Sequence, residues 1–369
     1  MKKLMIPLFC ILILSGCWNY QDTDKRLIVA GASIDLGENG ETLVTAETVT
    51  FSVGENKPES NLISGSGSSV SDAFNDILKK SGKELYWQHA TVIILGADYA
   101  RRGILELLDY ILNDYEMRYS LNLAVSGLEK GSDVFEMDIG DNEISCFAAA
   151  SLLEEGDKLG YCIREYAYDT LNVYAENLKD FALPLLVSGE NGVMEASGCA
   201  AFHGDKMVGT FSSVESQYLQ MVRGTLHSME LQIDTDEIKS SVNIASPKVR
   251  VRAKVADNTI LATVDMKADY EVLMSIENPP MEKNERMELI RGMVENQLVR
   301  GMEDTNAHFR AIGADLFGWG EKIFRRYPDE YDKLSGSGSF SAPVKLTFMP
   351  RLSSRIEGVA GSTINQEGG

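Results

Sequence analysis

Apolar and polar residues alternate most regularly over two neighbouring runs in the second half of the chain. Apolar side chains take the odd positions of 249–255 and the even positions of 260–276. This period of two predicts two β-strands, and Asp257-Asn258 between them predicts the turn of a hairpin. If Val255 lies opposite Ile260, both apolar rows fall on one face of the hairpin.

The sequence also predicts the contacts on the polar face of this hairpin and the helices that follow it. The same register places Arg250 opposite Asp265, a cross-strand pair worth about 0.2–1 kcal/mol. Apolar residues then return at helical spacing over 283–309, which predicts a long helix able to cover the apolar face. A second helix is predicted over 315–327 and a last strand over 344–348. The pattern is typical of an α+β domain, an antiparallel sheet covered by long helices.

The first half of the chain mixes short strands and helices. Residues 25–53 predict paired strands joined at a Gly-Glu-Asn-Gly turn. An apolar strand at 91–95, an amphipathic helix over 101–115 and an alternating strand over 119–125 follow one another. Such a strand–helix–strand unit predicts parallel strands with a right-handed crossover. The run Ser64–Ser69 predicts a flexible loop, and Ser71 the N-cap of the next helix.

The division into domains follows from these patterns. Helices are predicted within 148–153 and 170–181, and a hairpin is predicted over 200–209. We therefore expect a mixed α/β region over 17–195, with room for two subdomains, and a C-terminal α+β domain over 196–369.

The first 16 residues have the pattern of a lipoprotein signal peptide. Two lysines precede an apolar run over 4–14, which is too short to span a bilayer as a helix because a span needs about 20 residues. The run ends in Leu14-Ser15-Gly16-Cys17, the pattern of a bacterial lipobox. We expect cleavage after Gly16 and lipidation of Cys17 with S-diacylglycerol and N-acyl chains, since two or more chains anchor a protein stably. The alternative is an ordinary signal peptide with a chance cysteine.

Charge narrows the class of partner. The chain has 35 basic and 55 acidic residues, a net charge of −20, and removal of Lys2 and Lys3 with the signal peptide leaves 33 against 55, or −22. Such a surface repels phosphate backbones, so nucleic-acid binding is not expected. It also lacks the polybasic segment that would hold it on anionic lipid, and the lipid anchor supplies that attachment instead.

Catalytic, metal and cofactor motifs are missing from the sequence. The exported part keeps Cys146, Cys162 and Cys199, an odd number without CxxC spacing, for which buried free thiols are favoured and a Cys146–Cys162 bridge is an open alternative. None of the four histidines stands in a metal-ligand spacing, and a structural hydrogen bond is favoured for His89. We therefore expect no enzyme activity, no metal and no cofactor.

Short motifs, in order along the chain, resemble the C subunits of spore germinant receptors, the Ger(x)C lipoprotein family. The resemblance covers nearly the whole mature chain. It rests on Gly16-Cys17-Trp18-Asn19, Ile28-Val29-Ala30-Gly31, Ile34-Asp35, Leu85, His89, Val92-Ile93-Ile94, Ala100-Arg101, Gly103-Ile104, Leu108-Asp109, Asp114, Glu116-Met117-Arg118, Gly313–Glu321 and Tyr327-Pro328. Within the late motif, Asp315, Gly318 and Gly320 are favoured as the turn and cap of a helix start over a contact site.

The resemblance implies a lipoprotein on the outer face of the spore inner membrane. It would act with two integral-membrane subunits in nutrient-triggered germination, have mixed α/β domains and have no catalytic activity. The alternative hypothesis is a solute-binding lipoprotein of an importer, which would need two similar doubly wound lobes around a cleft. The long antiparallel hairpin at 248–277 argues against that alternative.

Overall fold

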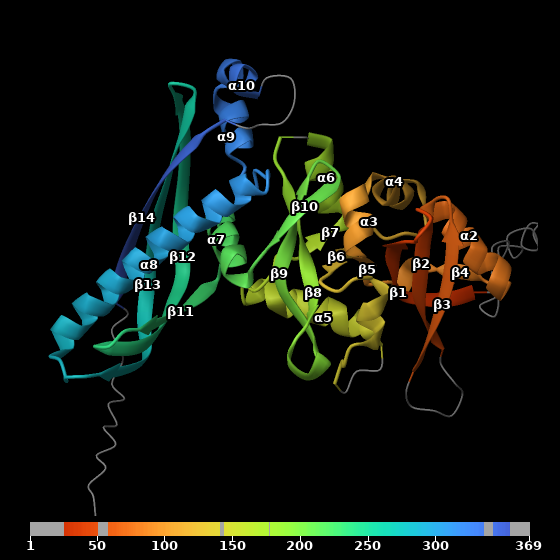
Figure 1. The fold of residues 1–369 in the computed structure, drawn as a ribbon, viewed down its shortest axis with the longest axis horizontal. Coiled ribbons are helices and arrows are strands. Elements are labelled where there is room, and N and C mark those ends of the chain that lie inside the picture. The colour runs from red at the N-terminus through yellow and green to blue at the C-terminus, as the bar shows by residue number, and fades with distance from the viewer. Residues whose placement is uncertain (1–25, 51–57, 141–143, 177, 336–341, 355–369) are drawn as a thin grey trace, which may run out of the picture.

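The computed structural model describes residues 26–50, 58–140, 144–176, 178–335 and 342–354. Within these ranges the chain forms a first sheet of ten strands and a second sheet of four. The two sheets lie at opposite ends of the long axis of the molecule, as Figure 1 shows. The predicted α+β class is confirmed.

The first sheet is parallel in its centre and antiparallel at its flanks. Its strand order is β10-β9-β8-β6-β5-β1-β2-β3, with β4 beside β1 and β7 beside β6. Strands β1, β4, β5, β6 and β8 run parallel, and the predicted parallel unit around the strand at 91–95 is confirmed. The strands are β1 (Arg26–Leu36), β2 (Thr42–Thr50), β3 (Glu59–Gly67), β4 (Glu84–Tyr86), β5 (Val92–Leu95), β6 (Asn122–Ser126), β7 (Glu165–Tyr166), β8 (Phe181–Ser188), β9 (Met194–His203) and β10 (Lys206–Phe211).

Helices cover both faces of the first sheet because its central strands are apolar on both sides. In β5, Ile93 and Leu95 enter the cluster that contains α2, α3 and α4, whereas Val92 and Ile94 enter the cluster that contains α5. The helices of this half are α2 (Val70–Ser81), α3 (Ala97–Arg102), α4 (Leu105–Asn113), α5 (Ser145–Lys158) and α6 (Ala167–Glu176), with 3-10 turns η2 (Trp87–His89), η3 (Ser132–Glu136) and η4 (Glu190–Gly192).

The second sheet carries the predicted hairpin. Its strands are β11 (Ser228–Asp234), β12 (Ile238–Ala256), β13 (Thr259–Glu277) and β14 (Val344–Ser354), in that order. Val255 pairs with Ile260 as predicted, and Asp257 and Asn258 take φ values of 49° and 55°, the left-handed pair of a two-residue hairpin turn. The last strand differs from expectation, since β14 runs parallel to β13 and the sheet is not wholly antiparallel.

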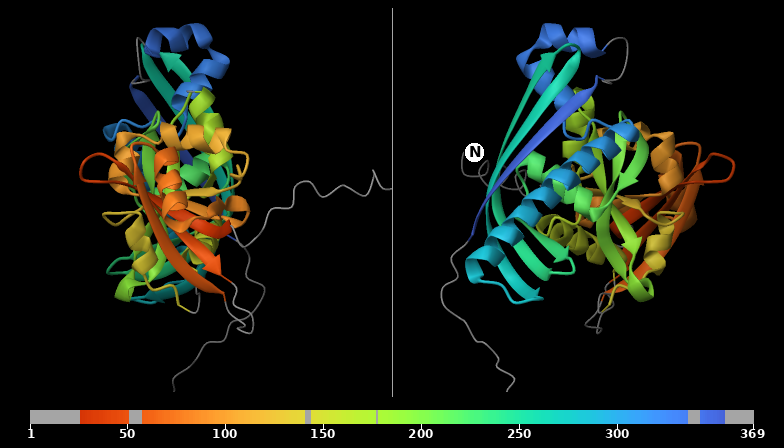
Figure 2. Two further views of the ribbon diagram at one scale, coloured as in Figure 1. Left: turned by 90° about the vertical axis from the view of Figure 1, so that its right-hand side faces the viewer. Right: turned by 60° about the vertical axis from the view of Figure 1, so that its left-hand side comes forward.

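Four helices complete this half of the molecule. They are α7 (Ser213–Arg223), α8 (Lys283–Ala311), α9 (Trp319–Arg326) and α10 (Pro328–Ser335). The predicted long helix is α8, and its buried residues Ile290, Val294 and Leu298 pack in one cluster with the apolar face of the hairpin. Figure 2 shows α8 lying along the second sheet.

The polar face of the hairpin corrects one predicted contact. Arg250 does lie opposite Asp265 in the register. The ion pairs of Asp265 are made instead by Arg252, at 2.5 Å, and by Arg351 of β14, at 3.5 Å. The Asp265 carboxylate therefore pairs with a diagonal neighbour on β12 and with a residue of β14. A prediction based on directly opposed residues does not include either partner.

The predicted loop at Ser64–Ser69 is wrong over most of its length. Ser64 to Gly67 belong to β3, which pairs with β2. A Cβ at Gly65 would lie 2.3 Å from the carbonyl oxygen of Ala73, so this glycine lets the strand approach α2 closely. The N-cap of α2 is Ser69, whose side chain accepts from the backbone N–H of Asp72, and not Ser71.

Three predicted helices have different bounds. The helix over 101–115 is two helices, α3 and α4, separated at Gly103, whose φ of 127° interrupts the helical path. The helix over 170–181 ends at Glu176, and the helix over 315–327 begins at Trp319.

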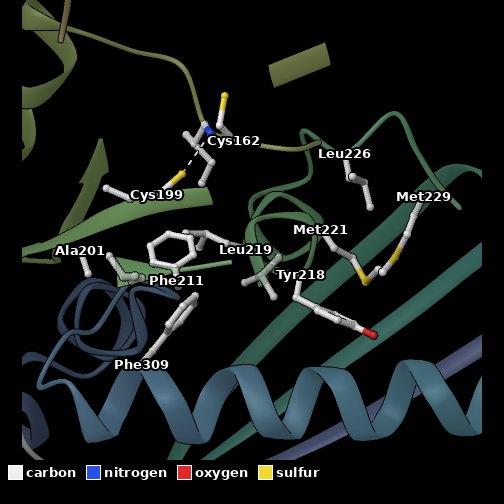
Figure 3. Packing of buried hydrophobic residues seen from close by; sticks show 14 of the residues in the cluster. Cys162, Cys199, Ala201, Phe211, Tyr218, Leu219, Met221, Leu226, Met229 and Phe309 are labelled. Atoms are coloured by element: carbon white, nitrogen blue, oxygen red, sulfur yellow. Dashed lines mark hydrogen bonds between the residues drawn. The ribbon is translucent and has the colours of Figure 1, made fainter. Parts of the chain in front are cut away.

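Buried side chains join the two halves. One cluster of buried residues contains members of α5, β9, α7, α8 and the second sheet. At its centre the rings of Phe211 and Phe309 meet edge to face with centroids 4.9 Å apart, next to Tyr218 and Leu219 of α7 (Figure 3). The first sheet extends to Phe211, so it continues beyond residue 195, where the predicted N-terminal region ends.

Candidate functional site: the face at the amino ends of the parallel strands

The described chain begins at Arg26, whose side chain is held on two sides. Its Nη2 lies 3.1 Å from Oε1 of Glu116, and both side chains of this pair are 16% exposed. Its guanidinium carbon lies 4.8 Å from the centroid of the Tyr86 ring. These contacts fix the position of Arg26 on the folded body. The predicted cleavage after Gly16 and lipidation of Cys17 lie outside the described residues and stay predictions.

The amino ends of β1, β4, β5 and β6 share one edge of the first sheet because these strands are parallel. Residues that follow α4 run along this edge, where Nη1 of Arg118 donates to the carbonyl of Gln88 at 3.3 Å. The backbone N–H of Tyr168 donates to the carbonyl of Tyr119 at 3.1 Å. We call the surface formed here the amino-edge face. Its side chains are those of Arg26, Tyr86, His89, Leu112, Tyr115, Arg118, Tyr119 and Tyr168.

Aromatic side chains are unusually exposed on the amino-edge face. Tyr115 is 88% exposed, Tyr119 51% and Tyr168 43%, and Leu112 beside them is 51% exposed. The rings of Tyr166 and Tyr168 stack with centroids 5.6 Å apart. Exposed tyrosines near an arginine are typical of contact surfaces, because a phenol combines a large apolar ring with one polar atom.

A polar pocket of about 490 Å³ opens beside this face. The side chain of Arg164 makes three contacts here. Its Nε donates to the side-chain oxygen of the buried Asn122 at 2.7 Å, and its Nη1 lies 3.4 Å from Oε2 of Glu154. Its guanidinium carbon lies 4.7 Å from the centroid of the Tyr166 ring. Asn122 in turn donates to the carbonyl of Thr91 at 2.7 Å. Arg164 is therefore held rigidly at the wall of the pocket, while Arg118, also in the lining, is exposed. The arrangement suits contact with polar or anionic groups.

In the described part of the chain, the structural hydrogen bonds of the histidines are made by His203 and His308, and not by His89, for which one was predicted. His89 is exposed and its ring contacts Tyr86 at 5.9 Å between centroids, so the predicted structural hydrogen bond is not found among the described residues. Nδ1 of His203 instead lies 2.9 Å from Asp180 in the first sheet half. Nδ1 of His308 in α8 lies 2.5 Å from Oε1 of Glu215 in α7.

The early motif residues Gly31 and Asp35 are structural. A Cβ at Gly31 would lie 2.5 Å from Sγ of Cys146, so only glycine lets β1 pass α5 here. The Asp35 carboxylate accepts from the N–H groups of Gly131 at 2.6 Å and Ser132 at 3.1 Å. Burial raises the pKa of Asp35, and these two hydrogen bonds oppose the rise.

The late motif forms the start of α9, as favoured from the sequence. The Asp315 carboxylate accepts from the N–H groups of Trp319 at 2.9 Å and Gly320 at 2.6 Å, and Gly318 takes a left-handed φ of 66°. The N–H of Asp315 donates to Asp180 at 2.6 Å, which ties α9 to the first sheet half. Burial raises the pKa of Asp315 to about 6, against the effect of the two N–H bonds that its carboxylate accepts.

The three described cysteines are buried free thiols, as favoured, and the alternative bridge between Cys146 and Cys162 is not formed. Sγ of Cys199 accepts from the N–H of Ile163 at 3.2 Å, and Figure 3 shows Cys199 and Cys162 among apolar side chains. Burial raises the pKa of Cys199 to about 12, so its thiol stays protonated at neutral pH.

Two features of the described residues bear on chemistry and on membrane insertion. Across those ranges, His, Cys, Asp and Glu side chains do not gather in any group of three or more suited to a metal ion. None of the helices in the described part of the chain is both long and apolar enough to cross a membrane.

The sequence pattern pointed to part of the amino-edge face only. His89, Glu116 and Arg118 belong to the motifs, whereas Tyr115, Tyr119 and Tyr168 carried no recognised signal. Tyr168 reaches the face because β7 pairs with β6, a contact between segments distant in the sequence. The density of tyrosines just after α4 is the one local signal that could have indicated it.

Comparisons with known proteins agree along the chain. The family model described as "Spore germination protein N-terminal domain" matches residues 19–188, and the model described as "Spore germination B3/ GerAC like, C-terminal" matches residues 197–345. The chain is 19% identical to Spore germination protein KC of Bacillus subtilis (strain 168), over 89% of this chain and 88% of that protein. It is 21% identical to Spore germination protein GerQC of Bacillus cereus, over 75% of this chain and 78% of that protein. The crystal structure of the GerBC protein matches the fold with a TM-score of 0.56 at 17% identity, covering 88% of this chain and 96% of that one.

Proposed function

Because the chain belongs to the GerAC-like family of spore germination proteins, we propose that it is the membrane-anchored lipoprotein subunit of a spore germinant receptor. It acts with integral-membrane subunits in nutrient-triggered germination. Its location is the outer face of the spore inner membrane, where the acyl chains on Cys17 hold it. The observation that carries this proposal is that the two family models together reach from residue 19 to residue 345.

The role we propose is contact and not catalysis. The amino-edge face offers exposed tyrosines and guanidinium groups, and its pocket is lined mostly by polar side chains, among which Arg164 is held by Asn122 and Glu154. Tethering to a membrane raises the effective concentration of the protein near membrane partners, so a modest interface suffices.

The importer hypothesis finds less support. A binding protein of that kind has two similar lobes that close over a solute. The described residues form one ten-stranded mixed sheet and one four-stranded sheet, which are unlike each other in size and topology.

The proposal is tested by replacing Cys17 with Ala in the spore-forming host. We expect the variant protein to leave the membrane fraction and nutrient-triggered germination to be lost or strongly slowed. Cys10→Ala is the matched control, since Cys10 lies in the part predicted to be removed, and it should leave both measurements unchanged. Mass spectrometry of the native amino-terminal peptide should find an acylated Cys17.

Two outcomes would overturn the proposal. One is a native protein whose Cys17 is unmodified. The other is a complete deletion of the gene that leaves nutrient-triggered germination intact when no similar protein substitutes for it.

A further inference from the structure

We propose that the amino-edge face lies against the headgroup region of the bilayer, with the exposed tyrosines and Arg118 contacting phospholipid headgroups. This inference rests on the proposed lipid anchor at Cys17. It adds an orientation: the first sheet is near the membrane and the second sheet stands away from it.

The reach of the tether is the first argument. Nine peptide units separate Cys17 from Arg26, and at about 3.3–3.6 Å each they span at most about 32 Å. Arg26 is fixed in the amino-edge face by Glu116 and Tyr86. The surface around Arg26 therefore stays within reach of the bilayer in any orientation of the body.

The chemistry of the side chains is the second argument. Tyr115, Tyr119 and Tyr168 combine large exposed fractions with a polar hydroxyl. Tyrosine rings are enriched at the level of lipid headgroups because the ring is apolar and the hydroxyl stays hydrated. Leu112, half exposed beside them, adds apolar surface of the kind that water solvates poorly.

Charge is the third argument. The whole chain has a net charge of −20, so most orientations present carboxylates to lipid phosphate. Beside this face Glu116 is paired with Arg26, and Glu154 is paired with Lys158 and Arg164, while Asp169 next to Tyr168 contributes one carboxylate. Arg118 is exposed and makes no ion pair with the described residues, which leaves its guanidinium available for a phosphate oxygen.

The test places a reporter at each end of the molecule. Tyr115→Cys and Leu273→Cys are made in the full-length lipoprotein and labelled with an environment-sensitive fluorophore. Leu273 is the matched control, since it is 55% exposed and belongs to the second sheet at the far end of the long axis. The native thiols of residues 146, 162 and 199 are buried, so labelling is directed to the new cysteine.

The labelled proteins are reconstituted in vesicles of equal parts phosphatidylethanolamine and phosphatidylglycerol that carry nitroxide on a fraction of the headgroups. We expect quenching at position 115 to be several-fold greater than at position 273. Equal quenching at the two positions would overturn the inference. Shielding at position 115 only in native spore membranes, and not in lipid vesicles, would also overturn it, because a protein partner would then cover the face.

The same preparation separates this inference from the proposed anchor. If the protein fails to float with the vesicles, the lipid anchor itself fails and the inference falls with it. If the protein floats and the two labels are quenched equally, the anchor stands and only the orientation is wrong. Tyr115 has a nearly free side chain, so its replacement should leave the fold intact.

Discussion

Replacement of Asp315 by Asn should remove one component of the pH dependence of stability. The Asp315 carboxylate accepts two backbone N–H groups at the start of α9 and is desolvated there. Burial raises its pKa from an ordinary 3.8 to about 6. Asparagine keeps one acceptor oxygen in nearly the same place and cannot ionise, so the two proteins differ mainly in this titration.

The size and sign of the effect follow from the two pKa values. Between pH 3.8 and about 6 the folded state keeps a proton that the unfolded chain has released, so stability falls as the pH rises. The stabilisation is complete below the lower value and is lost as the pH passes the upper one. A shift of roughly two units corresponds to about 3 kcal/mol of unfolding free energy. The substitution also leaves one N–H without its acceptor, which costs about 1–3 kcal/mol at every pH.

The assay is denaturant unfolding of both proteins between about pH 4 and pH 7, with Asp329→Asn as the control. Asp329 is exposed in the first turn of α10, so its replacement should leave the shape of the profile unchanged. We expect the unfolding free energy of the wild-type protein, taken relative to that of the Asp315→Asn variant, to fall by about 2–3 kcal/mol across this range. Two profiles that remain parallel would refute the assignment of a raised pKa to Asp315.

Three further outcomes are expected. In α8, Gly292→Ala should raise the unfolding free energy by about 0.5–1 kcal/mol, because a Cβ there meets no other atom. Gly301→Ala in the same helix should lower it by about 1–3 kcal/mol, because a Cβ there would lie 2.0 Å from Oη of Tyr218. Thermal unfolding of the two variants measures both effects. Arg252→Ala should cost about 0.2–1 kcal/mol through its lost ion pair and Arg250→Ala less, and equal costs in denaturant titrations would contradict the diagonal pairing. The three described cysteines should resist alkylation near neutral pH until the protein is unfolded, and rapid labelling of the native protein would show that they are not buried.

Local patterns were sufficient for the hairpin of the second sheet. The alternation of apolar and polar residues over 249–276 and the turn at Asp257-Asn258 depend only on residues close in sequence. The observed strand register follows from them. The same information did not give the partner of Asp265, because the length and direction of an arginine side chain decide whether it reaches a direct or a diagonal neighbour.

Packing between distant segments explains what the sequence did not show. The Ser/Gly run at 64–67 has the composition of a loop, yet it forms a strand because its glycines allow α2 to lie close against β3. The amino-edge face is likewise assembled from residues near 26, 86, 118 and 168, which only the sheet brings together. Motif residues such as Arg118 marked its position, but its aromatic character depends on the exposure of Tyr115 and its neighbours.

The shared interior of the two halves has a mechanical consequence. A single packed cluster contains residues of α5 and β9 from the first half, of α7, and of α8 and the long hairpin from the second half. Interiors of this density are nearly incompressible and pass displacements on instead of absorbing them. A small tilt imposed at the proposed tether would therefore swing the remote tip of the hairpin through a larger arc, as the arm of a lever magnifies the movement at its pivot.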